Sequence, residues 1–383
     1  MKFLHVIPSL NPTLGGPVEG LKQMSLALCN AGHASDVVVF DDEEDDWLSK
    51  SGPFKIHVLG PHHTGYWISF KFIPWLRKHH SDYDVIVVHG IWQFHSFAVW
   101  LAMLGAKTPY FVFAHGMLGP WFKKRHPIKH LKKCLYWIFA EYHVVHNARA
   151  LLFTCEQEML HAKNSFYPYN INELVVGFGT LPPDNVNTSL MAKYRYPQIN
   201  NKRVLLFIGR ISYIKGCDLL IESFANVCRE YESIHLVIAG PDQDNWMKDL
   251  VKQSKKLGIC ERITWVGQLE SELKWGVLQS ADALILPSHH ENFGMVVAEA
   301  LACGVPVLLT DKVNIWREVV KDGAGFAEND SLEGISRMLK KWLILDAETI
   351  VEMKNNAINC FNKRFLMDNV AINLVDIIDR NIR

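Results

Sequence analysis

Short runs of apolar residues alternate with amphipathic stretches along the whole chain of 383 residues. The runs are continuous and rich in β-branched residues, which is typical of strands buried on both faces of a parallel sheet. In the first half, these runs predict strands over residues 2–7, 34–40, 85–89, 110–114, 150–154 and 174–176. A helix is expected over residues 17–30, because Pro17 suits the first turn of a helix.

The same alternation restarts in the second half. Its apolar runs predict strands over residues 203–208, 235–239, 262–266, 283–286 and 305–309. Between the halves, residues 180–202 contain prolines and asparagines with little apolar periodicity, and we predict a linker there. Strands separated by helical stretches predict an α/β protein with parallel sheets.

Two domains follow from this organisation. We predict an N-terminal domain of residues 1–183 and a C-terminal domain of residues 184–363 that includes the linker. Residues 364–383 are amphipathic and predict a terminal packing helix. Ligands of open parallel sheets bind at the carboxyl ends of the strands. Two such sheets facing each other would form a cleft, and we expect the site residues there.

Composition and charge exclude several classes of protein. Apolar residues are 49% of the chain and charged residues 21%, an ordinary globular mixture. The 40 basic and 40 acidic residues cancel, so the overall charge indicates no nucleic-acid partner. The eight cysteines form no C-x-x-C pair, which favours reduced thiols in a cytoplasmic protein over a zinc site or disulfides. No apolar run reaches the ~18 residues that a membrane span needs.

Two glycine-containing segments could bind an anion. Gly15 and Gly16 precede Pro17 at the start of the first predicted helix, where free backbone N–H groups favour negative charge. The alternative is a plain turn. In the second half, Gly209 and Arg210 follow a strand, and Lys215 precedes the next helix. Both cations suit a diphosphate, and the alternative is a pair of solvated loops.

Residues 288–299 carry the most informative pattern. Glu291 lies in the turn after a buried strand, and Gly294 permits close approach of the backbone. The N–H groups of residues 293–296, from Phe293 onward, begin a helix. Glu299 lies in an otherwise apolar helix, where an unpaired carboxylate would be costly. Ribose or hexose hydroxyls would satisfy it, and the alternative is a structural salt bridge.

Further candidates come from single positions. His115 follows the strand at residues 110–114, and either a structural or a functional role fits it. The D-x-D patterns at residues 82–84 and 242–244 could hold a metal–diphosphate, but turn chemistry explains both, and we expect no metal site.

The segment 121–142 is basic and amphipathic. Its basic residues, all before Glu141, are Lys123, Lys124, Arg125, Lys129, Lys132 and Lys133. Its apolar positions at helical spacing are Ile128, Leu131, Leu135 and Ile138, with aromatic residues such as Phe122 between them. Such a segment, from Lys123 to Lys133, suits an anionic membrane surface. The alternative is a core helix with a charged outer face.

Together these motifs resemble one enzyme family. Glu291 and Glu299, with seven residues between them, look like the E-x7-E signature of retaining glycosyltransferases. Gly209–Arg210 with Lys215–Gly216 looks like the G-R-x4-K-G motif of the same family. The segment 300–307 and the pair Gly15–Gly16 are also typical. The chain therefore resembles glycosyltransferase family 4 over nearly its whole length. It departs at residues 312–318, where many members have a glycine-rich loop.

This resemblance implies a GT-B fold, two Rossmann-like domains facing across a cleft, with the terminal helix returning to the first. It implies that Arg210 and Lys215 hold the donor diphosphate and that Glu299 binds ribose hydroxyls. Glu291 would contact the donor sugar beside the N–H groups of residues 292–294, and His115 would lie near the anomeric centre. No metal or other cofactor is implied.

The implied activity is retaining, metal-independent transfer of a hexose from a UDP- or GDP-linked donor. The acceptor would be a glycan or a lipid-linked molecule of bacterial-type polysaccharide synthesis. The basic segment from Lys123 to Lys133 would place it at the inner face of the cytoplasmic membrane. UDP-glucose, UDP-galactose and GDP-mannose all fit the motifs. Two alternatives are a nucleotide-sugar 2-epimerase of GT-B architecture and a non-catalytic nucleotide-sugar-binding protein.

Overall fold

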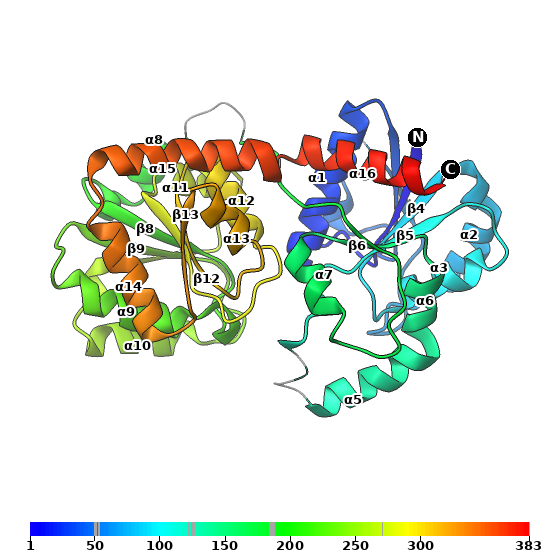
Figure 1. The fold of residues 1–383 in the computed structure, drawn as a ribbon, viewed down its shortest axis with the longest axis horizontal. Helices are drawn as coiled ribbons and strands as arrows, with labels where there is room; N and C mark the ends of the chain where they lie inside the picture. The colour runs from blue at the N-terminus through cyan, green and yellow to red at the C-terminus, as the bar shows by residue number, and fades with distance from the viewer. Residues whose placement is uncertain are drawn as a thin grey trace. The chain divides into compact units, whose positions relative to one another are not determined.

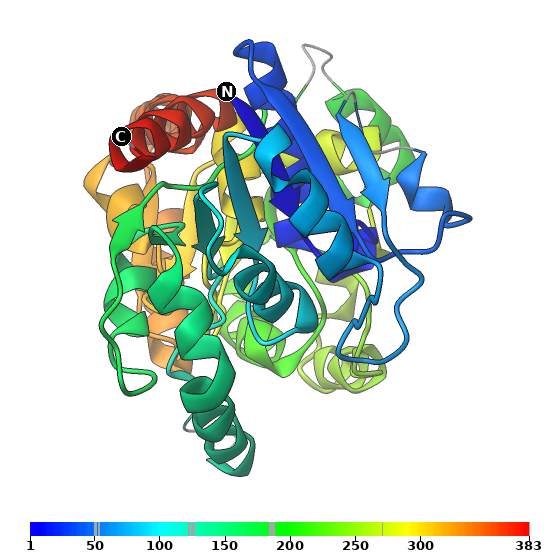
Figure 2. The same ribbon diagram turned by 90° about the vertical axis from the view of Figure 1, so that its right-hand side faces the viewer.

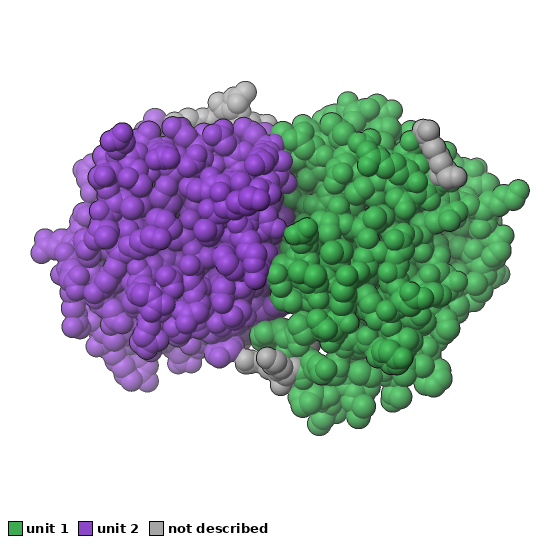
Figure 3. All heavy atoms as spheres, in the orientation of Figure 1, with its two compact units in different colours: residues 1–181, 366–383 green, residues 182–365 purple. Residues whose placement is uncertain are grey.

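The structure is a computed structural model that describes residues 1–49, 52, 54–121, 123, 127–183, 188–269 and 271–382. The chain forms two units, residues 1–181 with 366–383 and residues 182–365 (Figure 3). The chain passes between them at residues 181/182 and 365/366, against the 183/184 and 363/364 expected from the sequence.

Seven parallel strands form the sheet of the first unit, in the order β3-β2-β1-β4-β5-β6-β7 (Figure 1). Their bounds are β1 (Lys2–Val6), β2 (Ala34–Val39), β3 (Lys55–Val58), β4 (Val85–His89), β5 (Tyr110–Phe113), β6 (Leu151–Phe153) and β7 (Glu173–Val175). All six predicted strands are present. The edge strand β3 was not predicted, because none of its residues is fully buried and it lacks a continuous apolar run.

Helices cover both faces of this sheet (Figures 1 and 2). They are α1 (Gly16–Asn30), α2 (Phe72–His79), α3 (Phe94–Met103), α5 (Pro127–Tyr136), a π-helix (Trp137–Glu141), α6 (Tyr142–Asn147), α7 (Glu156–Ala162) and α16 (Met367–Ile382). Short 3-10 helices lie at Pro12–Leu14, Asp46–Leu48 and His80–Asp82.

Successive strand residues point to opposite faces and feed two different cores. On one face, Val88 and Val112 pack with residues of α2, α3 and α6. On the other, Val87 and Phe113 pack with residues of α1 and α16. The C-terminal helix α16 therefore belongs to the core of the first unit, where it lies beside α1 (Figure 1).

The second unit is built on six parallel strands, in the order β10-β9-β8-β11-β12-β13. Their bounds are β8 (Arg203–Ile208), β9 (Ile234–Ala239), β10 (Ile263–Gly267), β11 (Ala283–Leu286), β12 (Val307–Thr310) and β13 (Gly325–Glu328). The helices are α8 (Ser189–Arg195), α9 (Cys217–Cys228), α10 (Met247–Lys256), α11 (Ser271–Gln279), α12 (Met295–Ala302), α13 (Trp316–Lys321), α14 (Leu332–Leu343), α15 (Ala347–Cys360) and a π-helix (Phe361–Phe365), with 3-10 helices at Pro197–Ile199, Tyr213–Lys215 and Cys260–Arg262.

The prediction of a plain linker over residues 180–202 was wrong for α8. This helix packs on α11 through small residues: a β-carbon at Gly276 would come 2.5 Å from the Thr188 carbonyl oxygen and 3.4 Å from the Ala192 side chain. The Thr188 amide also donates to Oε1 of Gln279 at 2.8 Å. Ala192 is the one buried residue within α8, so no apolar periodicity marks this helix in the sequence.

Helix α5 belongs to the predicted basic segment, and Figures 1 and 2 show it projecting beyond the rest of its unit. None of its residues is buried, so the alternative of a core helix does not hold for residues 127–136. Phe122, Lys124 and Arg125 of the segment lie outside the described residues. Within the described ranges, no helix has both the length and the apolar character needed to cross a membrane.

Candidate active site

The site residues of the second unit lie after neighbouring strands. Gly209 and Arg210 follow β8, Glu291 lies in the loop after β11, and Lys312 lies in the loop after β12. Since β8, β11 and β12 are adjacent and parallel, their carboxyl ends meet at one edge of the sheet. This is the edge at which parallel α/β sheets bind ligands.

Lys215 and Glu291 form an ion pair between Nζ and Oε2 at this edge. The two residues are 76 positions apart in the sequence, and both side chains are largely buried. Gly216 makes the approach possible. It has a φ of 67°, and a side chain there would overlap the carbonyl oxygen of Pro287 in the β11 loop. The predicted cation and the predicted carboxylate are thus brought into direct contact.

Arg210 lies on the exposed side of the same edge. Its Nη1 donates to Oε1 of Gln243 at 3.1 Å, in the loop after β9. That loop contains one of the D-x-D patterns. The carboxylate of Asp242 accepts the backbone N–H groups of Trp246 at 2.8 Å and Met247 at 3.3 Å. Asp242 therefore stabilises the turn that leads into α10.

Residues 312–314, in the loop after β12, pair with the loop that contains Glu291. The Glu291 amide donates to the Lys312 carbonyl at 3.0 Å, and the Asn314 amide donates to the Glu291 carbonyl at 3.1 Å. Nδ2 of Asn314 also donates to Oδ1 of Asn292 at 3.2 Å. These bonds hold the backbone of Glu291 and orient the side chain of Asn292.

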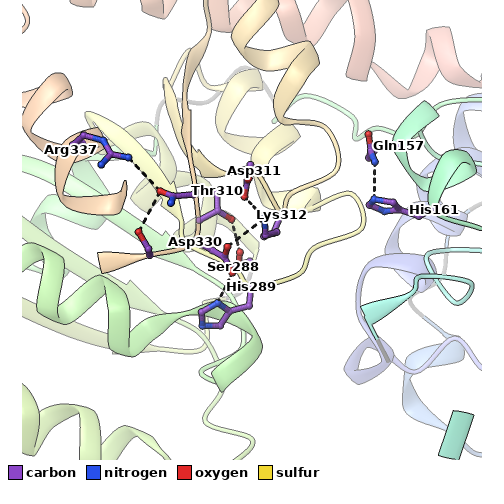
Figure 4. A network of polar contacts seen from close by, with 11 residues as sticks. Gln157, His161, Ser288, His289, Thr310, Asp311, Lys312, Asp330 and Arg337 are labelled. Atoms are coloured by element: carbon purple, nitrogen blue, oxygen red, sulfur yellow. Dashed lines mark hydrogen bonds and ion pairs between the residues drawn. The ribbon is translucent and has the colours of Figure 1, made fainter. Parts of the chain in front are cut away.

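A second polar network fixes the start of the same loop (Figure 4). Nδ1 of His289 lies 3.0 Å from Oδ2 of Asp330, and the His289 ring stacks on Tyr213 with ring centres 4.8 Å apart. Lys312 reaches Asp311 at 2.8 Å and Asp330 at 3.5 Å. Asp330 and Lys312 were not among the predicted site residues. Their pairing depends on loops after β11, β12 and β13, which the sequence alone does not bring together.

Helix α12 begins directly after this loop. Gly294 caps it with a φ of 76°, which leaves the first N–H groups of the helix facing the loop. The Phe293 ring is buried beside Phe365, so Phe293 offers only its backbone to a ligand. Oε1 of Glu299 lies 2.8 Å from Nζ of Lys274 on α11. The alternative of a salt bridge is therefore present in the free chain, and its cation, Lys274, was not predicted from the sequence.

In the first unit, Gly15 and Gly16 lie at the start of α1. Gly15 has a φ of 82° and a β-carbon there would meet open space, so a ligand could approach the backbone closely. One turn on, Gly20 packs so tightly on the Phe178 ring that a side chain would overlap it. Phe178 in turn makes an edge contact with the His115 ring, with centres 5.6 Å apart.

His115 lies in a strained turn after β5, with a φ of 47° followed by 77° at Gly116. The carboxylate of Glu158 on α7 holds this turn. It accepts the Gly116 amide at 2.5 Å, the Thr154 amide at 2.8 Å and the Thr154 hydroxyl at 2.5 Å. Glu158 is buried and was not predicted, since its bond to Gly116 spans 42 positions.

The His115 ring belongs to a row of histidines. Its Nε2 lies 3.0 Å from Nδ1 of His89, and Nε2 of His89 lies 2.9 Å from Nδ1 of His5. Burial lowers the pKa of His115 to about 4 and that of His5 to about 3, and it lowers the pKa of His89 well below its ordinary value. His115 is therefore a neutral imidazole near pH 7.

Two family models match the chain. The model described as "Glycosyl transferase 4-like domain" matches residues 15–177, within the first unit. The model described as "Glycosyl transferases group 1" matches residues 193–359, within the second unit. Together they cover most of the chain.

Curated relatives match over shorter stretches. An uncharacterized glycosyltransferase from Methanocaldococcus jannaschii is 30% identical over 185 residues, 46% of this chain and 45% of that protein. A D-inositol 3-phosphate glycosyltransferase from Mycolicibacterium gilvum is 37% identical over 109 residues, 28% of this chain and 24% of that protein. The chain thus spans less than half the length of each of these relatives.

Solved structures match over the whole chain. HepE from Anabaena, in complex with UDP, is 16% identical with a TM-score of 0.79, over 99% of this chain and 100% of that one. A glycosyltransferase from Rickettsia africae is 15% identical with a TM-score of 0.79, over 100% of this chain and 98% of that one. At these identities the likeness shows a shared fold.

Proposed function

We propose that this chain, which belongs to the glycosyltransferases of the GT-B fold with a family 4-like first domain, transfers a hexose from a nucleotide diphosphate sugar. The donor is UDP- or GDP-linked, and the acceptor is a glycan or lipid-linked molecule of bacterial-type polysaccharide synthesis. The transfer retains the anomeric configuration.

The observation that carries this proposal is the contact between Lys215 and Glu291 at the carboxyl edge of the second sheet. A nucleotide diphosphate gains negative charge as its bond to the sugar breaks. Cations already in place at that point stabilise the charge, and a single such donor is typically worth ~3 kcal/mol. In the free protein Glu291 balances Lys215. When the donor binds, its diphosphate takes over Lys215, with Arg210 beside it, and Glu291 turns to the sugar hydroxyls.

Glu299 is proposed to hold the ribose. Lys274 pairs with Oε1 of its carboxylate, which orients the group and leaves Oε2 for the ribose hydroxyls. The structure of HepE was solved with UDP and glucose and with UDP-glucose, which supports a donor of this class for a chain with the same fold.

Retention of the anomeric configuration is proposed because none of the site residues named above is suited to be the general base that inversion needs. Inversion needs a general base on the far side of the sugar from the diphosphate. His115 is a poor base, because burial lowers its pKa to about 4 and its Nε2 is engaged by His89. The leaving phosphate, held by Arg210 and Lys215, is proposed to take the acceptor proton on the face from which it departs.

The reaction is proposed to need no metal or other cofactor. Lys215 and Arg210 would supply the positive charge that a divalent cation provides elsewhere. In the D-x-D pattern at residues 242–244, backbone amides already occupy the carboxylate of Asp242. We expect EDTA to leave activity intact, and a loss that Mg²⁺ or Mn²⁺ restores would contradict this.

The acceptor is proposed to be presented at an anionic membrane surface, on the cytoplasmic side, through the basic helix. This name denotes α5 (Pro127–Tyr136), whose lysines are Lys129, Lys132 and Lys133. Ile128 and Leu131 on this helix are 75% and 65% exposed, and Leu135 is exposed as well. Exposed apolar side chains between lysines suit insertion at the interface of an anionic bilayer.

A donor panel tests the proposed function. UDP-glucose, UDP-galactose and GDP-mannose would each be scored by slow hydrolysis and by the shift of the melting temperature. One of these donors should raise the melting temperature and be hydrolysed slowly without acceptor. A panel in which no nucleotide sugar binds would contradict the proposal.

A further inference from the structure

Three histidines from three adjacent parts of the first sheet form one hydrogen-bonded row. His5 lies in β1, His89 ends β4, and His115 follows β5, and the order of these strands is β1-β4-β5. The two ring-to-ring bonds join Nδ1 of His5 to Nε2 of His89 at 2.9 Å and Nδ1 of His89 to Nε2 of His115 at 3.0 Å. His5 is fully buried and His89 nearly so.

Two bonds in series between neutral imidazoles must point the same way. A neutral imidazole has one N–H donor and one bare nitrogen acceptor. If His89 donates through Nδ1, its Nε2 must accept from His5; if it donates through Nε2, its Nδ1 must accept from His115. The row therefore has only two arrangements, one directed toward His115 and one directed toward His5. The low pKa values given above keep the three rings neutral near pH 7.

The buried end of the row decides between these arrangements. Nε2 of His5 is buried and has no hydrogen-bond partner within the described part of the chain. Direction toward His5 would place an N–H group at this position, whereas direction toward His115 leaves a bare lone pair. Buried N–H groups without an acceptor are rare in native proteins, and under-satisfied acceptors are less so.

A neighbouring histidine shows that this core accommodates an unpaired lone pair. Nε2 of His95 lies 2.9 Å from the His89 carbonyl oxygen and 3.2 Å from that of Gly90. Since carbonyl groups only accept, Nε2 of His95 carries the proton. Its Nδ1 is then a bare acceptor, and it too is buried without a partner in the described ranges.

We infer that His5 and His89 are positioning residues that hold His115 as its Nδ1–H tautomer, so that the ring donates a hydrogen bond from Nδ1 to an oxygen of the ligand. Nε2 of His115 is engaged by His89, and Nδ1 is the ring nitrogen left for the ligand. The direction of the row does not depend on the proposed function. Only the identity of the accepting oxygen, a hydroxyl of the donor sugar, rests on it.

The tautomer can be read directly from the free, full-length protein. Long-range ¹H–¹⁵N correlation spectra of ¹⁵N-histidine-labelled protein distinguish a protonated ring nitrogen from a bare one, and loss of signals in His115→Gln identifies those of His115. The Nδ1–H form is expected in the wild type. In His89→Phe the donor is gone, and the His115 pattern should change. An Nε2–H form in the wild type, or an unchanged pattern in His89→Phe, would overturn the inference.

Paired substitutions separate positioning from packing. An Asn side chain places its amide where Nδ1 of a histidine lies, and a Gln side chain places it near Nε2. His89→Asn should therefore restore the Nδ1–H tautomer of His115, whereas His89→Gln should not. His95→Gln is the matched control, because His95 donates through Nε2, and it should leave the tautomer of His115 unchanged.

Kinetics supply the second readout. His89→Phe should lower kcat/KM for UDP-glucose or the active panel donor by about 10-fold, the scale of one hydrogen bond. His89→Asn should recover most of this loss. Equal losses in His89→Asn and His89→Phe would contradict the row's direction. An Nδ1–H tautomer in a protein that transfers no sugar would leave the row intact and remove only the proposed function.

Discussion

Replacing Lys274 isolates the carboxylate of Glu299 and separates its two proposed roles. The ion pair joins Nζ of Lys274 to Oε1 of Glu299 at 2.8 Å, with side chains 25% and 7% exposed. In Lys274→Met the carboxylate would remain in an apolar helix without its cation. Breaking a fully buried pair costs about 3–5 kcal/mol. Since water reaches Lys274, we expect a loss of ~1–3 kcal/mol in the free energy of unfolding.

The same carboxylate should matter separately for nucleotide binding. Glu299→Gln removes the charge that would bind ribose hydroxyls, and we expect nucleotide affinity to fall by ~1–3 kcal/mol. The double variant Lys274→Met with Glu299→Gln should regain most of the stability lost in Lys274→Met, because no buried charge remains. It should not regain the nucleotide affinity.

Urea unfolding and calorimetric titration with UDP and GDP measure the two quantities on the same four proteins. Arg337→Met is the control, since its pair with Glu328 has the same 2.8 Å separation but lies at the surface, and stability should barely change. Unchanged nucleotide affinity in Glu299→Gln, together with a collapse of the melting temperature, would make Glu299 a purely structural residue.

Three further predictions concern charge. Lys215→Ala and Arg210→Ala should each lower kcat by ~10²-fold or more without unfolding the protein, since both are proposed to act on the developing diphosphate charge. Wild-type turnover in either variant would remove that assignment. The protein should sediment with anionic vesicles at low salt, because each lysine of the basic helix contributes about 1 kcal/mol of attraction to the anionic surface. Sedimentation that persists after these lysines are neutralised would refute the membrane proposal. Burial raises the pKa of Glu141 from 4.5 to about 7, so the folded state binds the proton more tightly than the unfolded state does. The free energy of unfolding should therefore fall by roughly 3 kcal/mol as pH rises from 4.5 to 7. Urea unfolding of Glu141→Gln over the same pH range should lack this fall.

The sequence predicted the buried strands and the loops that follow them, because continuous apolar runs mark central parallel strands wherever they occur. Strands β3 and β13 were not predicted. Both are four-residue edge strands with half-buried positions, so neither carries a continuous apolar run. Helix α8 was not predicted, because Ala192 is its one buried residue and the sequence therefore shows no apolar periodicity there.

Side-chain partners were harder to predict than loops. Lys215 and Glu291 were each predicted from their own motifs, and the sheet order then brought them together. Glu158 and His89 have no local motif, and they act on the His115 turn from α7 and β4. Such contacts depend on which strands are neighbours, and a single sequence does not specify this order.

The most direct test of glycosyl transfer with retention is the anomeric proton coupling of the first product formed from an α-linked nucleotide sugar. With the donor selected by the panel and a glycan or lipid-linked acceptor, we expect an α-linked product. A β-linked product would contradict attack from the face on which the phosphate departs, and it would require a general base on the far side of the sugar. A nucleotide sugar altered at C2, with no new glycosidic bond, would contradict the assignment as a transferase.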